Sequence, residues 1–532
     1  MRSENQNTQG IMVKYPLGIQ SFEKLRNKGC VYVDKTDYIY QLAYSGTAAY
    51  FLARPRRFGK SLLCNTLRAF FEGKKELFEG LKIYDLEKDW TKYPVIHIPL
   101  ASGNFAKQGI LYKRLANCLK RYEQKYLGVF NDEEDLGIRL QNDVEDVFEK
   151  TGLQTVMIVD EYDNPLINSK HLEEDKAIYR GFFTVLKDYD DYFRFVFLTG
   201  VTKYAKTSIF SGNNQPEDIS LDANFSAICG ITHKELRDIF AEEIQAFANQ
   251  ENVSYEDMLS KLKKWYDCYL FHERGDKVFN PVSIFNVLKK KDFKNYWYET
   301  GTPTILLNRI KKSTFDITQL KSDVEYSKDD LETYKDGENT IDIVPLLYYS
   351  GYLTIKSYIE EERLYILGFP DYEVEMSFFN SLAKEFYGSP DSANGFNYSK
   401  FLGDFRRGDI ESVIERLKAL FCTLPYANNK KIKLIERDFQ NVIYLVFSIL
   451  GEYIISEAHF SKGRADSILI NKDYVYLFEF KIDQDAQTAL NQIDTKNYAG
   501  RFKMDNRKIF KIGVNFSSCE KNIVDWMAEE AC

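Results

Sequence analysis

Cysteine and histidine are scarce in this chain. Its 532 residues contain eight cysteines and five histidines, all scattered, and no two cysteines have the C-x-x-C spacing. Structural zinc sites need clustered ligands and disulfide frameworks need paired cysteines, so we expect neither. Scattered thiols are typical of a reducing compartment, which predicts a cytoplasmic protein.

Long apolar runs are missing as well. The first ten residues (MRSENQNTQG) are polar and lack the apolar stretch of a signal peptide, and no later run is long enough to cross a bilayer. An excess of positive charge is also missing, because 71 Lys and Arg are outnumbered by 79 Asp and Glu. We therefore expect no membrane partner, and any nucleic acid would have to bind a local patch.

The chain has ample apolar material for packed cores. Hydrophobic residues form 44% of it, which argues against general disorder, and 532 residues are too many for one core. Changes in patterning predict four parts. These are a flexible tail (1–12), an N-terminal α/β domain (13–230), a mainly helical linker or lid region (231–425) and a C-terminal α/β domain (426–532).

Short apolar segments alternate with longer amphipathic ones in the N-terminal domain. Nearly continuous apolar strands separated by helices predict a parallel sheet covered on both faces. The expected strands are 48–53, 95–100, 155–160 and 193–199, and the expected helices include 60–71, 110–127 and 173–188.

A phosphate-binding loop is predicted where the first of these strands ends. The segment Arg54–Ser61 (RPRRFGKS) follows the strand and leads directly into an amphipathic helix. In such a loop Gly59 permits close approach of the backbone, Lys60 reaches the β- and γ-phosphates, and the Ser61 hydroxyl ligates Mg²⁺. The strand–loop–helix context is the one that this motif requires.

The loop departs from the general pattern at one position. Where G-x-x-x-x-G-K-[ST] has its first glycine, this chain has Arg54, so the backbone is expected to follow a different path. A basic turn that merely caps a helix is the alternative interpretation. If the loop binds a nucleotide, Arg56 and Arg57 are predicted to contact it.

A pair of carboxylates follows another predicted strand. The apolar segment 155–160 ends in Asp160 and Glu161, at the edge where parallel sheets bind ligands. Asp160 is predicted to hold Mg²⁺ through water, and Glu161 to orient or deprotonate the attacking water. Thr199 and Thr202 follow the next strand and are weaker candidates for sensing the γ-phosphate, since a threonine at a strand end is ordinarily structural.

These motifs resemble the bacterial AAA-ATPase-like family, in which the Arg-Pro-Arg-Arg-Phe-Gly-Lys form of the loop is usual. The resemblance covers about residues 12–225, with similarity to the family's helical region further on. It implies a P-loop NTPase-type domain at 13–230 with ATP and Mg²⁺ as ligands, and it supplies no biological role. The matching segments are Tyr15-Pro-Leu-Gly, Tyr32-Val-Asp-Lys-Thr, the loop itself, Val159-Asp-Glu-Tyr-Asp, 265–271 and 279–284.

A second group of charged residues lies near the C-terminus. Glu479 and Lys481 are two apart on an expected strand and so point to the same face. Asp466 begins the preceding expected strand, and a tight turn would pair the two strands as a hairpin. Carboxylates that hold Mg²⁺ beside a lysine are what metal-dependent phosphodiester cleavage needs. An exposed strand face with alternating charge is the alternative.

This arrangement resembles the PD-(D/E)XK nuclease superfamily over about residues 431–516, and implies an α/β restriction-endonuclease-like domain. Asp466, Glu479 and Lys481 align with its D…E-x-K core, and Glu436 in the preceding helix matches its acidic helix residue less closely. Gln492 and Tyr498 depart from the Gln-x-x-x-Tyr spacing of some members, so no role is assigned to them.

The combined motifs predict an ATP-dependent protein that cuts nucleic acid, with DNA favoured over RNA. Residues 430–532 contain 15 basic and 15 acidic side chains, so no strong field would attract a polyanion there. Two alternatives remain: a nucleotide-controlled switch that binds nucleic acid without cutting it, and a nuclease with a non-hydrolysing P-loop domain. Arg180 and Arg194 are available as arginine fingers but neither can be assigned, which leaves a homo-oligomer open.

Overall fold

The computed structural model contains two compact units. Unit 1 comprises Met1–Gly301 and Val324–Glu373, and unit 2 comprises Thr302–Asp323 and Val374–Cys532. Within them, the structure describes residues 13–203, 216–266, 269–297, 306, 309–310, 320, 323–333, 342–387, 398–423, 454–456, 459–460, 463–464, 467–471, 473–502 and 507–531.

A five-stranded sheet in the order β2-β3-β4-β1-β5 forms the centre of unit 1, and every neighbouring pair is parallel. The prediction of an α/β domain built on a parallel sheet is confirmed. The register pairs Pro99 with Asp160 and Ala53 with Gly200, so the carboxyl ends of four strands meet at one edge. The strands are β1 (Ala49–Ala53), β2 (Val95–Pro99), β3 (Thr155–Asp160), β4 (Phe193–Gly200) and β5 (Glu217–Asp218).

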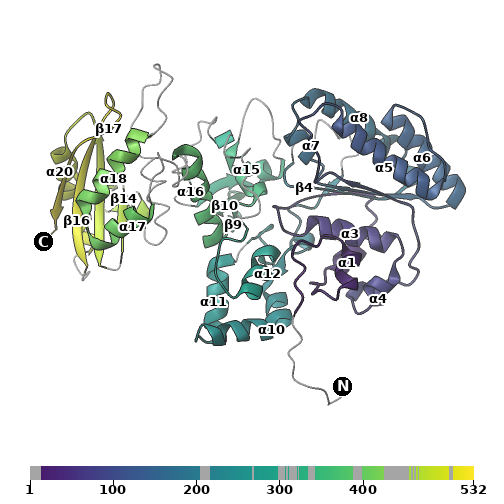
Figure 1. The fold of residues 1–532 in the computed structure, drawn as a ribbon, viewed down its shortest axis with the longest axis horizontal. Helices are drawn as coiled ribbons and strands as arrows, with labels where there is room; N and C mark the ends of the chain where they lie inside the picture. The colour runs from purple at the N-terminus through teal and green to yellow at the C-terminus, as the bar shows by residue number, and fades with distance from the viewer. Residues whose placement is uncertain are drawn as a thin grey trace, which may run out of the picture. The chain divides into compact units, whose positions relative to one another are not determined.

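Helices cover both faces of this sheet because its strands are apolar on both sides. All six residues of β3 are buried, as the continuous run TVMIVD predicts. Figure 1 shows α5, α6 and α8 on one face and α1, α3 and α4 on the other. The bounds are α1 (Phe22–Asn27), α2 (Thr36–Tyr44), α3 (Lys60–Phe71), α4 (Lys82–Leu86), α5 (Ile110–Tyr126), α6 (Leu136–Thr151), α7 (Asn164–Ile167) and α8 (Leu172–Asp188).

A separate helical core follows the sheet within unit 1. Its helices are α10 (His233–Gln250), α11 (Tyr255–Tyr266) and α12 (Pro281–Lys290), and a short antiparallel pair joins β6 (Ile231–Thr232) to β7 (Val278–Phe279). Side chains from near the start of the chain, including Tyr15, Val31 and Val33, pack against this core. The N-terminal segment therefore belongs structurally to the helical core as well as to the sheet.

A three-stranded antiparallel sheet in unit 1 was not expected from the sequence, which predicts a mainly helical region here. The strands are β8 (Val324–Ser327), β9 (Thr354–Ile359) and β10 (Leu364–Gly368), in the order β8-β10-β9. They are short and only partly buried, so their sequences lack a clean alternation. The helices α14 (Lys328–Thr333) and α15 (Ile343–Ser350) accompany this sheet.

Unit 2 contains a mixed sheet in the order β11-β14-β15-β16-β17. Within this sheet only β15 and β16 are parallel, and α20 joins them, as the crossover between two parallel strands requires. Strand β17 was not expected, because most of its side chains are exposed. The bounds are α16 (Tyr372–Tyr387, mostly in this unit), α17 (Tyr398–Arg407), α18 (Ile410–Thr423), β11 (Ile454–Ser456), β12 (His459–Phe460), β13 (Gly463–Arg464), β14 (Ser467–Ile470), β15 (Tyr474–Ile482), α20 (Ala486–Lys496), β16 (Lys508–Ser517) and β17 (Asn522–Glu530).

Two sequence predictions about helices can be compared with the structure. The helix that is expected to precede Asp466 and to carry Glu436 lies outside the described residues. Among the helices that are described, none has the length and apolar character that crossing a membrane requires.

Candidate functional site

The phosphate loop (Arg54–Ser61) curls around the ammonium group of its own lysine. Gly59 has a φ of 97° and caps α3, which begins at Lys60. The Lys60 side chain is buried, and its Nζ donates hydrogen bonds to the carbonyl oxygens of Arg54 (2.9 Å) and Pro55 (3.1 Å). A loop in this conformation at a helix N-terminus presents backbone N–H groups and one fixed cation, which suits a polyphosphate.

Arg54 points into the protein interior. Its Nη1 donates to the carbonyl oxygens of Ala53 (2.9 Å) and Ser220 (2.7 Å), and its Nη2 donates to that of Phe225 (3.0 Å). The guanidinium also lies 4.0 Å from the centre of the Phe271 ring, and the residue is only 1% exposed. Arg54 therefore fastens the loop to segments far away in the sequence.

The unusual backbone angles of the loop occur at positions other than Arg54. Positive φ values occur at Arg57 (70°) and Gly59 (97°). This explains why the position of Arg54 does not need glycine. Arg56 and Arg57 are both exposed, so the loop offers two cations at the surface beside the buried ammonium of Lys60.

We expect Arg54→Gly to weaken the protein, although it restores the general phosphate-loop pattern. The change removes the donors of three buried carbonyl groups and leaves a cavity, so the free energy of unfolding should fall by about 2–4 kcal/mol. Urea unfolding measures this. Arg57→Gly is the matched control, because Arg57 is exposed and already has a positive φ. Equal stability of wild type and Arg54→Gly would contradict the assigned role.

Two carboxylates lie at the carboxyl end of β3. Asp160 is buried, and its Oδ1 accepts a hydrogen bond from Thr199 Oγ1 (2.8 Å) at the end of the neighbouring strand. The same hydroxyl accepts a bond from the backbone N–H of Glu161 (3.2 Å). Burial raises the pKa of Glu161, while the positive charge of Lys60 opposes this shift. Thr199 therefore orders both acidic residues near the phosphate loop.

A third carboxylate, Asp163, was not singled out by the sequence analysis. Its Oδ2 accepts hydrogen bonds from the backbone N–H groups of Val201 (3.0 Å) and Thr202 (2.8 Å) and from Thr202 Oγ1 (3.1 Å). Asp163 is fully buried, and burial raises its pKa although these donors oppose the shift. It joins the ends of β3 and β4, and its position in the run Asp-Glu-Tyr-Asp was the available signal.

A pocket lined mainly by apolar residues opens beside the phosphate loop, with a cavity volume of about 80 Å³. Sites for small ligands are typically lined by apolar side chains in this way. Among the described residues that line it, Lys35 carries the only charge. The lining comes from the N-terminal segment, the loop with α3, the segment before β6, and α12: Pro16, Leu25, 31–33, Lys35, Phe58, Gly59, Leu62, Leu63, 228–231, Pro281 and Phe285.

A second polar site lies on β15 in unit 2. Glu479 is 1% exposed, and its Oε1 is 3.1 Å from the Nζ of Lys481. The same oxygen accepts a hydrogen bond from Nε2 of Gln492 on α20. Opposite Glu479 the neighbouring strand has Gly513, where a side chain would collide with Ala486 and Ala489 of α20. This glycine lets α20 lie close to the sheet and bring Gln492 to the carboxylate.

The structure describes only part of the predicted nuclease site. Asp466 and Glu436 lie outside the described residues. The spacing of Gln492 in the sequence indicated no role, yet its amide contacts the central carboxylate. Tyr498 packs in the core of the unit.

Two lysines of β16 are paired with acidic side chains. Lys511 lies 2.8 Å from Asp494 and 3.1 Å from Glu529, and Lys508 lies 3.6 Å from Glu530. These ion pairs reduce the positive field that a nucleic acid would meet.

No self-contained metal centre is present in the part of the chain that the structure describes. Nowhere in it do three or more His, Cys, Asp or Glu side chains gather in a way that could hold a metal ion. In nucleotide sites, the phosphates themselves commonly supply oxygen ligands to Mg²⁺.

Comparison with known proteins gives matches to two family models. The model described as predicted AAA-ATPase matches residues 16–210, and that of the PD-(D/E)XK nuclease superfamily matches residues 434–526. An uncharacterized protein in the vnfD 5' region of Azotobacter chroococcum mcd 1 is 32% identical over 531 residues, which cover 97% of this chain and 99% of the relative. The crystal structure of Cdc6p from Pyrobaculum aerophilum is similar over 68% of this chain and 94% of that chain, with 12% identity and a TM-score of 0.23.

Proposed function

This chain belongs to the predicted AAA-ATPase family and carries a PD-(D/E)XK nuclease superfamily domain at its C-terminal end, and from this premise we propose that it binds and hydrolyses ATP to control Mg²⁺-dependent cleavage of DNA. The observation that carries the proposal is the phosphate loop. Its buried Lys60 and the carboxylates of Asp160 and Glu161 lie at the carboxyl edge of one parallel sheet. Parallel α/β sheets bind their ligands at this edge.

The residues at this edge fit a nucleotide with its metal ion. Lys60 would neutralise the β- and γ-phosphates, and the exposed Arg56 and Arg57 would add charge from the loop. The Ser61 hydroxyl and Asp160 would hold Mg²⁺, which stabilises the negative charge of the phosphates. Glu161 would then orient the attacking water, with its backbone fixed by Thr199.

The apolar pocket supports a nucleotide rather than inorganic polyphosphate as the ligand. It lies directly beside the loop, since Gly59 and Leu62 contribute to its lining. A purine ring is apolar on its faces and is commonly bound among apolar side chains such as these. We assign the adenine of ATP to this pocket.

The chemistry of the β15 site supports a nuclease. Glu479 and Asp466 would hold Mg²⁺ against the scissile phosphate, and Lys481 would stabilise the developing charge. The donors from Lys481 and Gln492 both reach Glu479 Oε1 and fix its orientation. Because Lys508 and Lys511 of the neighbouring strand are paired with acids, binding would depend on the metal and on local contacts.

Glu161→Gln tests the proposed hydrolysis. The substitution keeps the size of the side chain but removes the carboxylate, so ATP turnover should fall by about 100-fold. ATP affinity should stay within about 3-fold of wild type, because the phosphate loop is untouched. Turnover is measured by phosphate release and affinity by equilibrium binding. Glu174→Gln, at an exposed position on α8, is the control. Unchanged turnover in Glu161→Gln would exclude the assigned role.

A further inference from the structure

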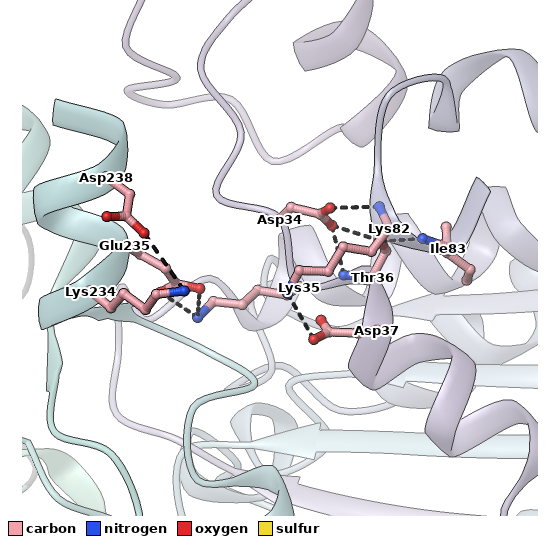
Figure 2. Close-up of polar contacts among 9 residues, drawn as sticks. All are labelled: Asp34, Lys35, Thr36, Asp37, Lys82, Ile83, Lys234, Glu235 and Asp238. Carbon is pink, nitrogen blue, oxygen red and sulfur yellow. Dashed lines mark hydrogen bonds and ion pairs between the residues drawn. The ribbon is translucent and has the colours of Figure 1, made fainter. Parts of the chain in front are cut away.

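We propose that Lys35 is a positioning residue of the nucleotide site, and that its ion pair with Glu235 holds two walls of the apolar pocket at the spacing a base requires. The inference rests on the proposed nucleotide binding. Lys35 lies in the N-terminal segment and Glu235 in the first turn of α10, 200 residues later. Figure 2 shows the two side chains reaching toward each other from these elements.

The residues on either side of Lys35 are fixed by a separate set of hydrogen bonds. Asp34 Oδ1 accepts from the backbone N–H (2.9 Å) and the hydroxyl (2.7 Å) of Thr36, and its Oδ2 accepts from the backbone N–H of Lys82 (2.8 Å). The Thr36 hydroxyl in turn accepts from the backbone N–H of Ile83 (3.1 Å). These bonds anchor the segment to α4 and leave the Lys35 side chain directed toward α10 (Figure 2).

Glu235 is also held in place before it meets Lys35. It forms a capping box with Thr232: the Thr232 hydroxyl accepts from the backbone N–H of Glu235 (3.1 Å), and Glu235 Oε2 accepts from the backbone N–H of Thr232 (2.7 Å). The Nζ of Lys35 is 2.7 Å from both carboxylate oxygens. The ammonium group of Lys35 therefore binds a carboxylate that the capping box already holds in place.

The pair is sheltered from water. The side chains of Lys35 and Glu235 are 9% and 22% exposed. Nearby, Lys234 and Asp238 form a pair at 3.8 Å whose side chains are 89% and 62% exposed. Removal of one partner from a buried ion pair destabilises a protein far more than the same removal from a surface pair. The partner that stays behind is then a buried charge without a counter-charge.

The position of the pair connects it to the pocket. Lys35 lines the pocket together with Val31 and Val33 of the same segment, and Gly230 and Ile231, just before α10, line it as well. The ion pair thus joins the two segments that form these walls. Its loss should widen the pocket and weaken the grip on the base while leaving the phosphate loop intact.

The test compares two ligands that share phosphates but differ in the base. Mg²⁺–ATP and Mg²⁺–tripolyphosphate are titrated into wild type and Lys35→Met, which keeps the length of the side chain. We expect ATP affinity to fall on the order of 10-fold and tripolyphosphate affinity to stay unchanged. Lys234→Met is the matched control and should alter neither affinity. Glu235→Gln keeps the capping acceptor and should also weaken ATP selectively, so it carries the test if Lys35→Met does not fold.

The outcomes separate this inference from the proposed function. If wild type binds neither ligand, the proposed nucleotide site is wrong and this inference falls with it. If wild type binds both, equal weakening of the two ligands in Lys35→Met and Glu235→Gln, or no weakening of either, overturns the role of Lys35 alone. A selective loss for ATP supports both.

Discussion

Lys60→Ala is expected to lower ATP turnover by at least about 100-fold, because it removes the buried ammonium group at the start of α3 that is assigned to the phosphates. In the wild type this ammonium bonds to the carbonyls of Arg54 and Pro55, so its position is set before any phosphate arrives. The variant should lose ATP binding as well as turnover, since the charge acts on both the bound and the reacting phosphates. Phosphate release and equilibrium binding measure the two effects.

Lys113→Ala is the matched control for this experiment. Lys113 is an exposed lysine of α5 in the same unit, so its removal changes net charge equally and should leave turnover unchanged. If Lys60→Ala hydrolyses ATP at the wild-type rate, the phosphate loop is not the site of hydrolysis.

Glu479→Gln is expected to reduce Mg²⁺-dependent DNA cleavage by a factor on the order of 100 or more, because an amide cannot replace a carboxylate as a metal ligand. The buried carboxylate accepts from Lys481 and Gln492 through the same oxygen. An amide there would also place an N–H group against a cation. Cleavage of labelled DNA with added Mg²⁺ measures the effect.

Two further variants show whether lost cleavage reflects the loss of the metal ligand or general damage to the domain. Gln492→Ala removes only a group that orients Glu479, so we expect a smaller loss of about 10-fold. Glu529→Gln is the control, because Glu529 is a partly exposed partner of Lys511 on β17. Wild-type cleavage by Glu479→Gln would rule out the assignment of the nuclease site to β15.

The parts of the fold that could be predicted are those in which neighbouring residues along the chain carry the signal. The strand, the phosphate loop and α3 are contiguous, and the predicted helix 60–71 has the bounds that the structure gives to α3. The run TVMIVD likewise fixed β3, because a continuous apolar strand has a clear signature. The α/β class follows from the same alternation.

Long-range contacts explain what the sequence did not reveal. The acceptors of Arg54 include the carbonyls of Ser220 and Phe225, more than 160 residues away, so the role of this arginine depends on tertiary packing. Gln492 reaches Glu479 only because Gly513 allows α20 to approach the sheet. Neither relation leaves a pattern within one segment.

Strands that combine polar and apolar residues were also missing from the prediction. Strand β17 has Ile523 as its one buried residue, and its remaining side chains are largely exposed. It is held by its pairing with β16, which a hydrophobic pattern cannot predict.

The most direct test of the account is whether nucleotide at the phosphate loop controls cleavage at the β15 site. DNA cleavage with Mg²⁺ is measured with and without ATP for wild type and Lys60→Ala, with Glu479→Gln setting the background. We predict that ATP stimulates wild-type cleavage by about 10-fold, a coupling of ordinary size, and that Lys60→Ala does not respond. Equal cleavage by wild type with and without ATP, or an undiminished response in Lys60→Ala, would contradict this prediction.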